Sequence, residues 1–160
     1  MKTIRPLRPE DLAVVCEHRR KMFAEMGTEP ATLEIASASY AIWVAPQLAD
    51  GSYFGFLVED AGVVVAGIGL KVMDFPPNPV HPESNKRGFI SNMWVDPEHR
   101  GRGLARELMM HGEAELLRRG ATYAVLQASA MGRPLYEQLG WSSTAEMGKM
   151  LGKILDKALE

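Results

Sequence analysis

Cysteine is almost absent from this sequence: Cys16 is the only one in 160 residues. A single thiol excludes an internal disulfide framework and any zinc site built on several cysteines. A reactive role and a structural role both stay open for Cys16. Its position on the apolar stripe of an expected helix favours the core.

An excess of one charge and long apolar runs are also missing. The formal net charge is -2, which gives no reason to expect binding to nucleic acid or to an anionic membrane. No apolar run approaches the ~20 residues that span a bilayer, and residues 1–6 contain no apolar signal core. Hydrophobic residues make up 46% of the chain, close to the globular norm. We therefore expect one soluble, cytoplasmic domain over residues 1–160.

Strand and helix patterns alternate along the chain, which predicts a mixed α/β domain. Strands are expected at residues 3–7, 53–59, 63–72, 89–95, 122–127 and 141–151. Helices are expected from Pro9 to Gly27, over 33–48 with a break near Pro46, from Leu104 to Gly120, over 132–139 and, as a short tail, over 154–159. Asp60-Ala61-Gly62 predicts a hairpin turn, and the four prolines of residues 73–87 predict a loop.

The turn Arg100-Gly101-Arg102-Gly103-Leu104-Ala105 lies between an expected strand and a long expected helix. Its glycines let the backbone approach a ligand closely, and the first N–H groups of a helix form an anion site. Arg100, Arg102 and Arg106 add positive charge. By spacing alone, an ordinary loop-to-helix turn fits equally well.

Two other phosphate loops fit this turn less well. A Walker loop needs lysine and then serine or threonine after its last glycine, where this chain has Leu104 and Ala105. A dinucleotide fingerprint needs glycine or alanine in place of Arg106, and an acid near the end of the next strand. Gln127 and Ala128 stand there instead.

Two segments resemble motifs of the GNAT superfamily of N-acetyltransferases. Residues 95–105 are similar to motif A, because Arg100, Gly103 and Ala105 satisfy its pattern of Gln or Arg, two free positions, Gly, one free position, then Gly or Ala. Residues 135–141, Leu-Tyr-Glu-Gln-Leu-Gly-Trp, are similar to motif B, with tryptophan in place of the usual phenylalanine. The motifs occur in the family's order and at its usual separation. The resemblance implies a single-domain GNAT fold with a mixed, mostly antiparallel sheet flanked by helices.

The resemblance also implies acetyl-coenzyme A (acetyl-CoA) as co-substrate. Its pantetheine arm would lie in a gap beside the strand before motif A, where a backbone amide would polarise the thioester carbonyl. The side chain of Trp94 could equally be a core aromatic. Ser129 stands where many members have an asparagine that contacts the arm. The residues expected to bind acetyl-CoA are Met93, Trp94, Val95, Arg100, Gly101, Arg102, Gly103, Leu104, Ala105, Arg106 and Ser129.

Tyr136 matches the family tyrosine that protonates the departing thiolate, although a buried helix tyrosine with a satisfied hydroxyl is the alternative. No general base is evident, because residues 89–95 contain no carboxylate. Asn92 in that strand could orient an amine or a water. The candidate bases elsewhere are Glu25, Glu29 and Glu34, and a proton path through solvent is a further alternative.

The basic cluster His18-Arg19-Arg20-Lys21 is expected to be a solvated helix face. The alternative is an anion contact, for example to substrate, because helices in this region cap the acceptor site in the family. His81 and His99 have no metal-ligand spacing, so we expect surface histidines and no metal.

The sequence therefore predicts an N-acetyltransferase that moves an acetyl group from acetyl-CoA to a primary amine, by direct attack in a ternary complex. The acceptor would be a small-molecule or protein amine, with no nucleic-acid or membrane partner. Family members often form dimers, which leaves a homodimer open. The alternatives are a non-catalytic acyl-CoA sensor or interaction module, and a protein that binds another nucleotide through the same turn.

Overall fold

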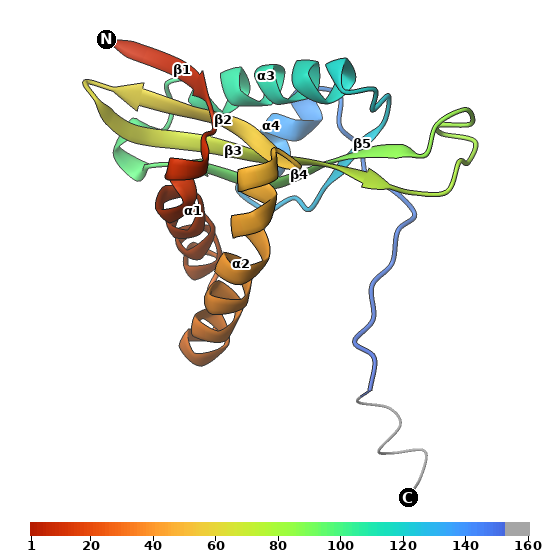
Figure 1. The fold of residues 1–160 in the computed structure, drawn as a ribbon, viewed down its shortest axis with the longest axis horizontal. Helices are drawn as coiled ribbons and strands as arrows, with labels where there is room; N and C mark the ends of the chain where they lie inside the picture. Colours follow the sequence, from red (N-terminus) through yellow and green to blue (C-terminus); the bar gives the residue numbers. More distant parts are fainter. Residues whose placement is uncertain (153–160) are drawn as a thin grey trace, which may run out of the picture. The chain divides into compact units, whose positions relative to one another are not determined.

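A five-stranded mixed sheet forms the centre of the fold in the computed structural model, which describes residues 1–152 (Figure 1). The strands run in spatial order β1-β2-β3-β4-β5, antiparallel from β1 to β4 and parallel between β4 and β5. Their bounds are β1 Lys2–Pro6, β2 Tyr53–Asp60, β3 Val63–Asp74, β4 Lys86–Val95 and β5 Ala124–Leu126. The predicted α/β fold with a mostly antiparallel sheet flanked by helices is confirmed.

Three long helices cover the sheet. Helices α1 (Leu12–Glu25) and α2 (Pro30–Asp50) pack against one face, and α3 (Leu104–Arg118) packs against the other (Figure 1). Short 3-10 turns precede α1 at Pro9–Asp11 and α3 at Pro97–His99. All of these elements belong to one compact unit, Met1–Ser129. Helix α4 (Arg133–Gln138) belongs to a second unit that begins at Ala130.

Strand β3 separates the two helical layers through the alternation of its side chains. Ile68 and Leu70 face α3. Their side chains lie close to Gly112 of that helix, where an added Cβ would contact both. Gly67 and Gly69 face the other way, toward α1. Both glycines lack a Cβ where aromatic side chains need the room: the imidazole of His18 lies against Gly67, and the phenol of Tyr53 lies against Gly69.

The hairpin between β2 and β3 turns at Ala61 and Gly62, which have φ angles of 50° and 80°. Two consecutive residues with positive φ make a turn whose twist matches that of the flanking strands. The predicted turn is therefore confirmed. Residues 75–85, between β3 and β4, form neither a helix nor a regular strand, in agreement with the predicted proline-rich loop.

Three expectations fail or fall outside the structure. The expected break near Pro46 is absent, because α2 continues through this residue. Proline has no N–H to donate to the carbonyl of Ile42 one turn earlier, and Ile42 is exposed on the surface of the helix, so this lost bond is tolerated. Residues 141–151 form no strand: Met147, Met150 and Leu151 are exposed, so the segment buries no apolar face. The expected helix at 154–159 lies outside the described residues.

The described residues include no helix that is long and apolar enough to cross a membrane. They also include no group of three or more His, Cys, Asp or Glu side chains arranged to hold a metal ion.

We expect Gly69→Ala to lower the free energy of unfolding by about 1–3 kcal/mol, the usual cost of overpacking a core. The added methyl group would collide with the hydroxyl of Tyr53. That ring cannot move aside easily, because it is 1% exposed and its hydroxyl accepts a hydrogen bond from Tyr40. Urea denaturation measures the change.

Gly148→Ala is the matched control, because no atom lies within 4 Å of the position that its new methyl group would occupy. We expect this substitution to change the free energy of unfolding by less than about 0.5 kcal/mol. Equal effects of the two substitutions would contradict the packing argument.

Candidate active site

Strand β4 contains one residue more than the facing part of β3. Gly69 pairs with Asn92 and Leu70 pairs with Ile90, which leaves Ser91 without a partner. The result is a β-bulge. Beyond it, side chains at even-numbered positions of β4 point to the opposite face of the sheet from those before it. Before the bulge, Gly88 faces Leu116 of α3. After it, Asn92 faces α1 and α2, where it contacts Arg19 and Tyr40.

The same bulge coincides with the end of pairing between β4 and β5. The parallel ladder covers only Gly88, Phe89 and Ile90, opposite residues 124–126. From Asn92 to Val95, β4 pairs with β3 alone. The side of β4 that faces away from β3 is therefore an open edge within the unit Met1–Ser129, as the gap predicted beside this strand requires.

The hydrogen-bond pattern shows which amides face this open edge. Asp96 N–H donates to Val65 O of β3 at 2.9 Å, so Trp94, two residues earlier, also directs its backbone toward β3. Met93 and Val95 then direct their N–H and C=O groups to the open edge. Of the expected residues Met93, Trp94 and Val95, the first and last thus direct N–H groups away from β3, while the C=O of Val95 accepts a hydrogen bond from Arg100 Nε. The indole of Trp94 is buried and donates to Asp96 Oδ1 at 2.8 Å.

The glycine turn leads from β4 into α3 with the geometry that its sequence predicts. Gly101 and Gly103 have φ angles of 73° and 80°, and space is open where a Cβ would stand. The first internal bond of α3 runs from Glu107 N–H to Gly103 O at 3.0 Å. The helix itself leaves earlier N–H groups, including those of Leu104 and Ala105, for another acceptor. Together with the helix dipole, they form a site that favours an anion.

The arginines around the turn have different roles. The guanidinium of Arg100 forms two hydrogen bonds to the carboxylate of Glu25, at 2.6 and 2.9 Å, and its Nε donates to Val95 O at 3.0 Å. It also lies over the ring of Trp94. Its side chain therefore connects the turn to α1. Arg102 and Arg106 are exposed, so their charges remain at the surface beside the turn.

On the opposite side of the bulge, a polar network links α1, α2 and β4. Arg19 Nη1 donates to Asn92 Oδ1 at 2.8 Å, and Asn92 Nδ2 donates to the hydroxyl of Tyr40 at 3.3 Å. Tyr40 in turn donates to the hydroxyl of Tyr53 at 3.0 Å. Asn92, expected to orient an amine or a water, thus has both ends of its amide engaged by protein groups.

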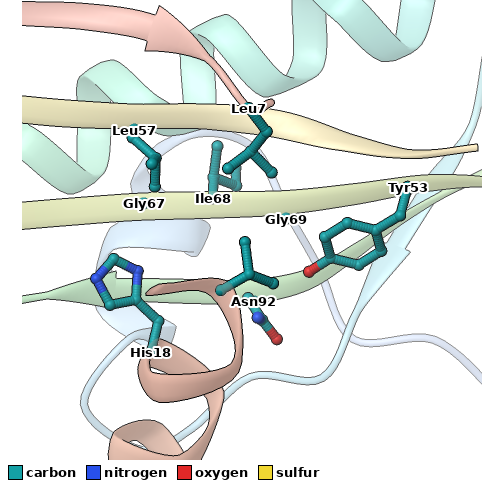
Figure 2. Close-up of a pocket in the computed structure, with 9 residues that line it drawn as sticks. Leu7, His18, Tyr53, Leu57, Gly67, Ile68, Gly69 and Asn92 are labelled. Carbon is teal, nitrogen blue, oxygen red and sulfur yellow. The ribbon is translucent and has the colours of Figure 1, made fainter. Parts of the chain in front are cut away.

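His18 corrects our expectation of a solvated basic face on α1. Its side chain is buried next to Gly67 and lines a pocket with room for about one water molecule, together with Tyr53 and Asn92 (Figure 2). Burial lowers the pKa of His18 from 6.5 to about 4, although Asp96 partly opposes the shift. His18 is consequently neutral at pH 7. Arg20, the partner of Glu17, and the side chain of Lys21 have the expected solvated character.

His81 is also not a surface histidine. It is 1% exposed, its Nδ1 lies 2.7 Å from Ser84 O, and its ring stacks on Tyr123. It therefore organises the loop between β3 and β4, where the sequence shows prolines but no sign of a buried ring. His99 is half-buried and lies 3.9 Å from Asp60.

Comparison with known proteins decides the family. A model of the acetyltransferase (GNAT) family matches residues 12–141. The chain belongs to this family. A GCN5-related N-acetyltransferase from Ralstonia eutropha JMP134 shares 48% identity at a TM-score of 0.92, over 94% of this chain and 99% of that one. Acetyl transfer is the general activity of the family, which uses acetyl-CoA.

More distant structures share the fold. A predicted acetyltransferase from Clostridium acetobutylicum, solved with acetyl-CoA, is 24% identical at a TM-score of 0.86, and the match covers 98% of both chains. An aminoglycoside N-acetyltransferase solved with CoA is 16% identical at a TM-score of 0.70, over 96% of this chain and 95% of that one.

The remaining predicted site residues lie after β5. Ser129 is half-buried and ends the first compact unit. Tyr136 belongs to α4 in the second unit, where it is 8% exposed and its ring lies against Gly132. Burial raises the pKa of Tyr136 above its usual value of 10. The phenol therefore keeps its proton at neutral pH, as a proton donor requires.

Two of the three candidate bases, Glu25 and Glu29, are made weaker bases by their hydrogen bonds. Hydrogen bonds from Arg100 lower the pKa of Glu25, and hydrogen bonds from Thr32 and Ala31 lower that of Glu29. Glu29 caps the first turn of α2. Glu34 is exposed on α2.

Sequence reasoning missed Tyr40, Tyr53 and Ser91, which share the network around the bulge. Their residue types are common in helices and strands. Only tertiary contacts bring them together, and no local pattern indicates it.

The buried His18 predicts a pH dependence of stability. Its pKa is about 4 in the folded protein against 6.5 in the unfolded chain, so the unfolded chain binds more protons between these values. Stability should therefore fall as the pH drops from 6.5 to 4, by up to about 3 kcal/mol from this group. NMR titration of the imidazole measures the pKa directly.

His18→Gln provides the control for this prediction. Carboxylates titrate alike in both proteins, so the difference between their stability–pH slopes isolates His18. Denaturation at several pH values from 4 to 7 should give a flatter curve for the variant. Identical slopes would show that His18 protonates in the folded state as easily as in the unfolded chain.

Proposed function

We propose that this protein transfers the acetyl group of acetyl-CoA to a primary amine by direct attack in a ternary complex. One observation carries the proposal: an open edge of β4 adjoins a glycine turn that leads into α3. The first feature provides donors for an amide-rich arm, and the second provides an anion site for a pyrophosphate. An unrelated phosphate ligand would need only the second.

The chemistry of these groups fits the parts of acetyl-CoA. The N–H groups of residues 101–105, with Arg102 and Arg106 nearby, would hold the pyrophosphate. Met93 and Val95 would pair with the pantetheine arm, and one of their amides would donate to the oxyanion that develops on the thioester carbonyl. Such a donor contributes about 3–4 kcal/mol to lowering the barrier.

Arg100 and Trp94 would support this site through contacts with β4 and α1. Arg100 already donates to Val95 O, so we assign it to holding the strand and turn together. Its backbone N–H donates to Pro97 O, so Arg100 would act on the ligand through the position of residues 101–105. Ser129 would supply one hydroxyl to the arm, in place of the longer asparagine side chain.

Tyr136 would protonate the thiolate of CoA as the C–S bond breaks. The proton of the attacking ammonium would leave through water, because β4 contains no carboxylate and both Glu25 and Glu29 are engaged elsewhere. The acceptor would be a small-molecule or protein amine. One structural neighbour is an aminoglycoside N-acetyltransferase, an example of a protein of this fold with a small-molecule acceptor.

Release of free thiol from acetyl-CoA across a panel of amines tests the proposal. We expect amine-dependent release. Tight binding of CoA without release with any amine would instead support the alternative function, a non-catalytic acyl-CoA sensor. Competition by CoA, but not by ATP or NAD, would exclude a site for another nucleotide.

Tyr136→Phe removes the proposed proton donor and keeps the ring. We expect kcat to fall about 100-fold, the low end of what a general acid contributes, while the Kd of acetyl-CoA stays within about twofold. Steady-state kinetics and calorimetry measure the two quantities. An equal loss of both would assign Tyr136 a structural role.

Tyr123→Phe is a matched control, because Tyr123 stacks on His81 in the loop region and has no proposed part in the reaction. We expect its kcat to remain near that of the unsubstituted protein. A comparable fall in kcat would mean that loss of any such hydroxyl disturbs the fold.

A further inference from the structure

Arg19 is a half-buried cation whose contacts are all with neutral groups. Its Nη1 donates to Ser91 O and Oγ, both at 3.1 Å, and to Asn92 Oδ1 at 2.8 Å. Its guanidinium lies 4.9 Å from the ring centre of Phe23 and 4.6 Å from that of Tyr40. The side chain is therefore held in one position, and Nη1 alone makes its hydrogen bonds.

Within residues 1–152, no carboxylate forms an ion pair with Arg19. The N–H groups on Nε and Nη2 donate to no described group, and these belong to the fork that matches an oxyanion. Three other arginines on or near α1 have acidic partners: Arg5 with Asp11, Arg20 with Glu17, and Arg100 with Glu25.

The surroundings of Arg19 favour an anion. His18, its neighbour on α1, is buried and neutral at pH 7. The two glutamates of α1 are neutralised by Arg20 and Arg100. An orientated guanidinium that is partly removed from water and lacks a counter-charge binds a carboxylate or phosphate more strongly than a solvated one does.

Its position relates Arg19 to the proposed reaction. The bulge that Arg19 holds lies directly before Met93, whose amide faces the open edge of β4. Arg19 thus reaches the strand from the α1 and α2 side, next to the point where the acetyl group would be held. An acceptor that enters between these helices and β4 would pass the free N–H groups of Arg19.

We propose that Arg19 binds an oxyanion of the acceptor, an inference that rests on the proposed function. The preferred acceptor would then be an amine with a carboxylate or phosphate group. The fork of Arg19 would hold that group while the amine reaches the thioester. A polycation such as an aminoglycoside or a polyamine would be repelled by the same charge.

Matched pairs of amines test this specificity. In each pair the anionic member has a carboxylate or phosphate group apart from its amine, and the neutral member has an uncharged group or none in that place. The pairs are β-alanine with β-alaninamide, 4-aminobutanoate with 4-aminobutanamide, and phosphoethanolamine with ethanolamine. We expect kcat/KM to favour the anionic member by about 10- to 100-fold, the range for a hydrogen bond to a charged group. The third pair separates phosphate from carboxylate, and spermidine tests the repulsion of a polycation.

Two variants of Arg19 separate binding from support of the strand. Arg19→Met keeps the apolar stem, and Arg19→Lys keeps a charge that can still hold the bulge but loses the planar fork. Arg19→Lys should raise KM for the anionic member about 10-fold or more and leave kcat/KM for the neutral member within about threefold. Arg19→Met, which has no donor for the bulge, should lower kcat/KM for the anionic member further and also lower it for the neutral member. Arg20→Met, an exposed neighbour paired with Glu17, should change neither.

The outcomes distinguish the two proposals. Acetylation of neutral amines without preference for the anionic members, or a preference that survives in both Arg19 variants, would overturn the role of Arg19 and leave the proposed function intact. Equal losses for both members of each pair would mean that Arg19 only supports the bulge. Failure to acetylate any amine would remove the proposed function and this inference together.

Discussion

The extra residue in β4 determines which atoms the sheet offers at its open edge. Without the bulge at Ser91, the alternation seen at Gly88 would continue, and Met93 and Val95 would direct their backbones toward β3. The bulge exchanges the residues that point their backbone groups toward β3 with those that point them away, just where pairing with β5 ends. The open edge itself follows from the end of β5, and the insertion selects Met93 and Val95, rather than Asn92 and Trp94, to present their N–H groups there.

Helix α1 holds this strand at two points. Arg19 bonds the bulge, and Glu25, nearly two turns further along the helix, holds Arg100 at the glycine turn. The ring of Trp94 lies under Arg100 and closes the second contact. The helix that would approach the acceptor is thus connected to both parts of the proposed donor site. Changes in one contact should be transmitted through α1 as well as through the strand.

The parts of this structure that local chemistry dictates can be predicted from the sequence. Glycine allows the positive φ found at Gly101, Gly103 and Gly62, and their place between elements makes both turns predictable. The bulge is not, because it depends on the partner strand. Likewise, helical spacing places His18 on a face of α1 but does not show that Gly67 leaves room for its ring. Residues 141–151 show that a pattern alone is not enough: Trp141 and Thr144 are the only aromatic or β-branched residues there, and the apolar side chains Met147, Met150 and Leu151 are exposed, so no strand forms.

The network behind the bulge has a direction, and that direction bears on the fate of the proton. Donation runs from Arg19 to Asn92, then to Tyr40, and then to Tyr53. Burial raises the pKa values of both tyrosines, so each keeps its proton at neutral pH. A chain that begins at a cation and consists of protonated groups accepts no proton from an ammonium. Its effect is to align its own dipoles and stiffen β4, so this network offers no path for the proton that the proposed reaction releases.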